Sequence, residues 1–183
     1  PVATELEHKD EYPTEIVETL KDLGLFGITV PEEYGGLGID MVSFALVFEE
    51  IAKGWMGIAG ILGSHSLSCW MIAKHGTQEQ RDTYLPDLAT GKRRTAIGLT
   101  EPGAGTDLAA LTTRAVHDGD DYIINGHKVF TSTAHFTTHM LVACKTAQDL
   151  PRHRSISMII VPNDAEGVTI RPLHTQALHQ TNE

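Results

Sequence analysis

A glycine-containing loop at residues 96–107 carries the residue types best suited to hold an anion or the polar edge of a ring. It reads Ala-Ile-Gly-Leu-Thr-Glu-Pro-Gly-Ala-Gly-Thr-Asp, with hydroxyl groups at Thr100 and Thr106. Glycines let backbone N–H groups approach a ligand closely, and successive N–H groups can form an anion-binding nest. The loop is neither a G-x-G-x-x-G fingerprint, because residue 108 is leucine, nor a P-loop, because no Gly-Lys-Ser/Thr follows. By spacing alone, a tight turn between strands explains it better than a phosphate site.

A second polar segment, residues 130–134, places an aromatic ring beside three hydroxyl side chains. It reads Phe-Thr-Ser-Thr-Ala. This combination suits a planar ligand that also accepts hydrogen bonds. An ordinary strand end has the same composition, so the segment is not specific by itself.

Charge and cysteine usage exclude several classes of function. The 183 residues include 14 Lys and Arg against 24 Asp and Glu, a formal net charge of −10, which argues against nucleic-acid binding. The acidic excess lies in residues 1–90, so an anionic ligand would favour the second half. Cys69 and Cys144 have no metal-ligand spacing and are typical of a reducing compartment. We expect no metal site, because no Cys/His cluster is present.

The first half of the chain has helical patterns. Apolar spacing predicts helices over residues 14–23, from residue 40 to about 52, and around residues 67–75. Thr77 and Gln80 fit a capping box that begins another helix, which we expect Pro86 to interrupt. The apolar stretch at residues 55–62 is too short to span a bilayer.

The second half has strand patterns. Residues 122–130 contain Asn-Gly, which predicts a hairpin with a type I′ turn at Asn125 and Gly126. Further strands are expected near residues 94–100, 110–117, 139–145, 155–161 and 167–171. The predicted fold class is therefore α+β: an all-α helical domain at residues 1–92, then an antiparallel β-sandwich or barrel domain at residues 93–183.

Taken together, four segments resemble the acyl-CoA dehydrogenase family and occur in the family's order. They are Leu-Gly-Leu-Phe-Gly-Ile at 23–28, Pro-Glu-Glu-Tyr-Gly-Gly-Leu-Gly at 31–38, Leu-Thr-Glu-Pro-Gly-Ala-Gly-Thr-Asp at 99–107 and Asn-Gly-His-Lys-Val-Phe at 125–130. The resemblance implies an N-terminal helical domain, a middle β-domain and a C-terminal four-helix bundle. This chain would hold most of the first two, with both ends truncated and the bundle missing.

The resemblance also implies FAD as cofactor, held by the loop that runs from Ile97 to Thr106. The backbone at Leu99 and the Thr100 hydroxyl would reach the flavin pyrimidine edge near N1 and O2. Gly105 and Thr106 would approach the pyrophosphate, and Thr106 would also face the CoA thioester substrate.

The second segment would complete the flavin site. By the same resemblance, Phe130 would lie against the flavin, and Thr131 and Ser132 would donate toward O4 and N5. Fixed donors at the ring edges would stabilise charge that arrives on the ring. Thr106, Thr131 and Ser132 stand where the family more commonly has Ser, Ile and Thr, and Thr133 stands where it has Asn.

The reaction implied is α,β-dehydrogenation of an acyl-CoA thioester to the 2-enoyl-CoA in fatty acid metabolism, with electrons passed to an electron-transferring flavoprotein. The catalytic glutamate would lie in the missing bundle, so no catalytic residue is expected in this chain, and Glu101 is interpreted as a structural carboxylate. An acyl-CoA oxidase, a flavin monooxygenase on the same fold and a non-catalytic binding module remain alternatives. The resemblance also implies a homotetramer at full length, and we expect a cytoplasmic location, or the mitochondrial matrix in a eukaryote.

Two residues of the helical half have two interpretations. In the family the helix start that carries His65 and Leu67 lies near the acyl tail, so both would line the substrate pocket. A helix cap and core position explain them equally well.

Overall fold

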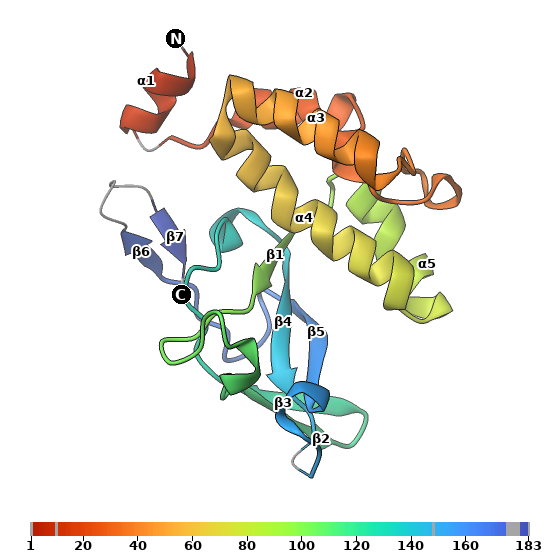
Figure 1. The fold of residues 1–183 in the computed structure, drawn as a ribbon, viewed down its shortest axis with the longest axis vertical. Helices are drawn as coiled ribbons and strands as arrows, with labels where there is room; N and C mark the ends of the chain where they lie inside the picture. Colours follow the sequence, from red (N-terminus) through yellow and green to blue (C-terminus); the bar gives the residue numbers. More distant parts are fainter. Residues whose placement is uncertain (1, 10, 148, 175–179, 183) are drawn as a thin grey trace. The chain divides into compact units, whose positions relative to one another are not determined.

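The computed structural model describes residues 2–9, 11–147, 149–174 and 180–182 (Figure 1). The chain forms two compact units that divide between Thr95 and Ala96. We call them the helical unit and the β unit. The predicted order, a helical domain followed by a β-domain, is confirmed.

The helical unit is built around its longest helix, α4. Its α-helices are α1 (Val2–Lys9), α2 (Thr14–Asp22), α3 (Met41–Gly54), α4 (Met56–His75) and α5 (Gln78–Ala89). Helix α4 packs against α3 and α5. Side chains of α2, the following turn and α4 form a shared core, which consists of Val17, Leu20, Phe26, Ile58 and Leu62.

Helix α4 begins at Met56, earlier than the pattern around residues 67–75 predicted, and so contains the glycine-rich apolar stretch. Within the described residues it alone has the length and hydropathy of a membrane-spanning helix. Core helices of globular proteins share these properties, and seven α4 residues are buried here. The feature does not establish a membrane span.

Helix α5 confirms one local prediction and contradicts another. The Thr77 side chain accepts a hydrogen bond from the Gln80 N–H, and the Gln80 side chain accepts one from the Thr77 N–H, so the capping box is present. The helix is not interrupted at Pro86, however, and continues to Ala89. An internal proline costs about 3 kcal/mol. Burial of Leu85 and Leu88 on both sides of the proline offsets this cost.

The β unit contains a mixed sheet and a separate two-stranded ribbon. The sheet strands are β1 (Thr95–Gly98), β2 (Arg114–Asp118), β3 (Asp121–Asn125), β4 (His139–Lys145) and β5 (Ile156–Pro162). Their order is β1-β4-β2-β3, with β5 also paired to β4. The ribbon pairs β6 (Pro172–His174) with β7 (Gln180–Asn182). The sheet is not wholly antiparallel, because β2 and β4 run parallel where Arg114 faces Lys145.

The hairpin predicted at Asn125 and Gly126 is wrong. Strand β3 ends at Asn125, and its antiparallel partner is β2, which it joins through a turn between Asp118 and Asp121. Gly119, within that turn, has a φ of +64°. The structure requires glycine at residue 126 because a side chain would not fit there: a Cβ would lie 2.1 Å from Thr113 Oγ1.

The strand predicted at residues 167–171 is also wrong. Gly167 has a φ of +83°, and the next ladder starts only at Pro172. The Val168 N–H donates to the Ala165 carbonyl, so the chain turns where a strand was expected. The strand predicted at residues 139–145 coincides with β4.

Candidate functional site

The glycine-containing loop leaves β1 as a tight turn. The Glu101 N–H donates to the Ala104 carbonyl at 2.9 Å, and the Ala104 N–H donates back at 3.1 Å. Ala104 is buried against Leu111 and Ala143, which anchors one side of the turn to the sheet. Gly105 and Thr106 lie on the exposed side. A Cβ at Gly105 would meet nothing within 4 Å, so the backbone there is open to a ligand.

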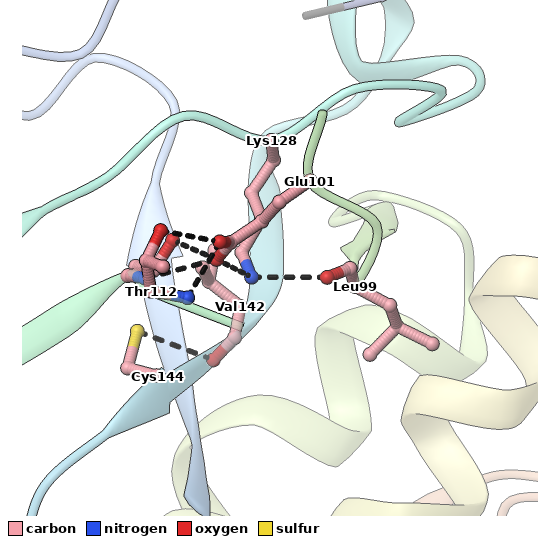
Figure 2. A network of polar contacts seen from close by, with 7 residues as sticks. Leu99, Glu101, Thr112, Lys128, Val142 and Cys144 are labelled. Carbon is pink, nitrogen blue, oxygen red and sulfur yellow. Dashed lines mark hydrogen bonds and ion pairs between the residues drawn. The ribbon is translucent and has the colours of Figure 1, made fainter. Parts of the chain in front are cut away.

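Below the turn, the Glu101 carboxylate is buried in a dense set of donors, shown in Figure 2. Oε2 accepts from the Thr112 N–H and hydroxyl at 2.6 and 2.7 Å. Oε1 accepts from the Thr113 N–H and hydroxyl at 2.9 and 2.5 Å, and from Lys128 Nζ at 2.9 Å. Burial by itself would raise the pKa of this carboxyl. The hydrogen bonds from Thr113, Thr112 and Lys128 outweigh burial and hold the pKa well below its ordinary value.

Lys128 joins the loop to the segment that carries Phe130. Its Nζ donates both to Glu101 and, at 3.0 Å, to the carbonyl oxygen of Leu99 (Figure 2). The next residue continues this connection, because the Val129 N–H donates to the Thr100 carbonyl at 2.9 Å. The two polar segments identified in the sequence are therefore adjacent in the fold.

Residues 130–134 have an unusual backbone. Phe130 and Thr133 are the non-glycine residues of the described chain with positive φ, at 56° and 65°. Phe130 is 60% exposed. Thr131 is buried, and its N–H donates to the Asn182 carbonyl, whereas Ser132 is exposed. The segment thus presents an aromatic ring and a hydroxyl to the surroundings while Thr131 anchors it.

A cavity of ≈ 390 Å³ lies within the β unit next to this anchor. Its wall includes Thr131 and Lys128 together with the apolar side chains of Met140, Val142 and Val161. The anchored face of the segment therefore borders a cavity lined by both polar and apolar side chains.

His65 lies in the interior of the helical unit, whereas Leu67 is 47% exposed. His65 Nδ1 accepts the Thr95 N–H at 3.3 Å, and Nε2 lies 3.0 Å from the Leu88 carbonyl oxygen, so Nε2 carries the proton. Burial lowers the pKa of His65 to about 4. The ring is therefore neutral and in the environment of a core histidine. Its contact with an acyl chain stays a prediction, as does that of Leu67.

The described residues contain no group of three or more His, Cys, Asp or Glu side chains placed to hold a metal ion. Both cysteines are free and buried. The exposed parts of the two polar segments offer hydroxyl groups, amide N–H groups and the Phe130 ring.

Comparison with known proteins identifies the family. The profile of the acyl-CoA dehydrogenase N-terminal domain matches residues 1–92, and that of the acyl-CoA dehydrogenase middle domain matches residues 96–182. The chain belongs to the acyl-CoA dehydrogenase family. A probable acyl-CoA dehydrogenase of Bacillus subtilis is 38% identical over 174 residues, which are 92% of this chain and 46% of the relative.

Two further relatives extend the comparison. A subunit of the caffeyl-CoA reductase–Etf complex of Acetobacterium woodii is 37% identical, over 92% of this chain and 45% of the relative. The crystal structure of an acyl-CoA dehydrogenase from Geobacillus kaustophilus has a TM-score of 0.87 and 36% identity, and the match covers 98% of this chain and 48% of that one. The chain thus spans about half the length of these acyl-CoA dehydrogenase relatives.

The donor set fits a flavin, the cofactor on which this family depends. The side of the loop that carries Gly105 and Thr106 is open, and the exposed Phe130 ring lies on the neighbouring segment. Sequence reasoning selected these residues but missed the role of Lys128. The available signal was a lysine two residues before the aromatic ring and a glutamate in the loop, but their separation of 27 residues conceals the pairing.

Proposed function

We propose that this chain forms the flavin-binding and part of the thioester-binding region of an FAD-dependent acyl-CoA dehydrogenase. The reaction would be α,β-dehydrogenation of an acyl-CoA thioester to the 2-enoyl-CoA. The observation that carries the proposal is the adjacency of loop 97–106 and segment 130–132. Hydrogen bonds from Lys128 and Val129 join these two segments in a chain of this family.

Each segment would hold a different part of the cofactor. The backbone at Leu99 and the Thr100 hydroxyl would donate at the pyrimidine edge, and Gly105 and Thr106 would approach the pyrophosphate. Both Gly105 and Thr106 are exposed, which supports this assignment. Bound FAD would supply the hydride acceptor.

The Phe130 ring would cover one side of the flavin, with Ser132 and Thr131 at its O4 and N5 edge. Ser132 is exposed. Thr131 is buried and would act by anchoring the segment, because its N–H donates to the Asn182 carbonyl. Preorganised donors at these edges stabilise charge on the ring without reorganising during the reaction.

The general base would lie outside residues 1–183. Glu101 is unsuited to the role because both carboxylate oxygens already accept hydrogen bonds. Its lowered pKa also makes it a weak base. We propose that Glu101 supports the loop and does not contact the substrate.

We also propose that the electrons pass to an electron-transferring flavoprotein. One relative belongs to a complex named for such a partner, which supports this assignment. A homotetramer at full length and a cytoplasmic location complete the proposal, and the two free, buried cysteines are consistent with a reducing compartment.

The test uses the full-length protein that contains residues 1–183. Its visible spectrum is recorded, and short-, medium-, long- and branched-chain acyl-CoAs are then added without oxygen. Bleaching of the flavin band by one class is expected and would name the substrate range. A flavin that binds but is never bleached would contradict dehydrogenation and favour the monooxygenase. In a separate assay with oxygen present, oxygen consumption during turnover would favour the oxidase. A colourless protein that does not bind added FAD would favour the binding module.

A further inference from the structure

We propose that Lys128 is a positioning residue for the flavin, which it orients through the loop backbone without touching it. This inference rests on the proposed function. Lys128 is nearly buried, with 11% of its side chain exposed, and its partner Glu101 has 3% exposed. An ammonium group withdrawn from water to this extent must have fixed partners, and here they are Leu99 and Glu101.

The bond to Leu99 determines the direction of one peptide group. A trans peptide is planar, so its N–H points opposite to its carbonyl. Since Lys128 Nζ holds the Leu99 carbonyl at 3.0 Å, the Thr100 N–H points away from Lys128. The lysine thereby fixes a backbone donor on the residue whose hydroxyl would reach the flavin.

The same side chain sets the distance between the two flavin segments. Lys128 donates to Leu99 and Glu101, and between them the Val129 N–H donates to the Thr100 carbonyl. Three consecutive loop residues are thus tied to two consecutive residues that immediately precede Phe130. These contacts fix the backbone that leads into Phe130 relative to Thr100.

Glu101 keeps the ammonium group in place. Four of the five hydrogen bonds that it accepts come from Thr112 and Thr113. The position of the carboxylate therefore does not depend on Lys128. Lys128 Nζ and Thr113, the residue just before β2, both donate to Oε1, so the chain of support runs from Thr113 through Glu101 to Lys128, and from there to the loop backbone. Neither charged group needs to contact the cofactor.

The experiment compares Lys128→Met with Thr112→Val in the full-length protein. The control removes one hydroxyl bond to Glu101 Oε2 and leaves both Lys128 contacts in place. Lys128→Met is expected to raise the FAD dissociation constant at least about tenfold, the value of one charge-assisted hydrogen bond, and to shift the visible flavin band. Thr112→Val is expected to leave the band unchanged and the constant within about twofold.

An unchanged band and affinity in Lys128→Met would overturn the inference while leaving the proposed function intact. An equal increase of the FAD dissociation constant in both variants would also overturn the inference, because the cause would then be general destabilisation of the protein. A wild-type protein that binds no FAD overturns the proposed function and this inference together. If Lys128→Met does not fold, Lys128→Arg keeps the ion pair but moves the donor from Leu99. A wild-type band and affinity in Lys128→Arg would then overturn the inference.

Discussion

Glu101 and His65 are both buried and titratable, yet their surroundings favour opposite charge states. Glu101 accepts five hydrogen bonds, which keep it ionised. The backbone partners of His65 are the Thr95 N–H and the Leu88 carbonyl, and the neutral ring satisfies both, with Cys69 Sγ also 3.4 Å from Nε2. Burial opposes charge at both residues. At Glu101 the donated hydrogen bonds outweigh burial, whereas at His65 the carbonyl acceptors that would favour the protonated ring do not.

The neutral state of His65 predicts a pH-dependent stability of the helical unit. Its pKa is lowered from 6.5 to about 4, so the unfolded chain binds the proton more tightly than the folded one. The stability that His65 contributes is complete above pH 6.5 and declines as the pH falls toward 4. From pH 7 to pH 4, the unfolding free energy of wild type should fall by about 3 kcal/mol more than that of His65→Gln.

Denaturant unfolding at several pH values measures this difference. His75→Gln is the control, since His75 lies on the same helix and is exposed. The control should follow the wild-type dependence on pH. A difference between wild type and His65→Gln that does not change with pH would contradict the argument.

At the scale of elements, sequence patterns predicted the structure correctly where the interacting residues lie close together in the chain. The capping box of α5 and the apolar run of β4 depend on neighbours within a few residues, and both were predicted. Asn125 and Gly126 also carry a local signal, but the glycine serves a contact with Thr113, 13 residues earlier. The loop and Phe130 could be selected by residue type, whereas the bridge made by Lys128 depends on contacts across 27 and 29 residues.

The corrected role of Gly126 predicts the effect of adding one methyl group. Gly126→Ala would place a Cβ 2.1 Å from Thr113 Oγ1, so the sheet must shift. We expect it to destabilise the β unit by about 3 kcal/mol, the range of overpacked cores. Gly103→Ala is the matched control, because a Cβ there meets nothing within 4 Å, and it should change stability by less than about 0.5 kcal/mol.

Thermal melting of both variants, followed by near-ultraviolet circular dichroism, measures these changes in stability. If Gly126→Ala melts at the wild-type temperature, the absence of a side chain at Gly126 is not required for packing against Thr113.

At the scale of the whole molecule, the chain combines two family domains but spans about half the length of its relatives. The proposed flavin site uses the β unit, and Glu101, the carboxylate in its loop, is committed to structural contacts. Flavin-contacting groups and a general base are separate requirements of dehydrogenation, and we propose that residues 1–183 supply only the first.

Because the base is proposed to lie outside this part of the protein, we expect that residues 1–183 expressed alone will not dehydrogenate an acyl-CoA. With added FAD and an acyl-CoA, reduction of an artificial electron-accepting dye should not exceed the rate without protein. The full-length protein is the positive control. Measurable turnover by residues 1–183 would place the base within them and contradict its proposed location outside this part of the protein.

The left-handed backbone at Phe130 has a consequence for anyone who would engineer this protein. A bulky side chain at a φ of 56° costs on the order of 1 kcal/mol, and Phe130 is 60% exposed within residues 1–183, so the fold of this part gains little from it. Glycine would adopt this backbone without strain. Selection for heat resistance alone would therefore replace Phe130 early and remove the ring proposed to face the cofactor. Laboratory evolution of this protein needs a flavin-dependent screen from the first round.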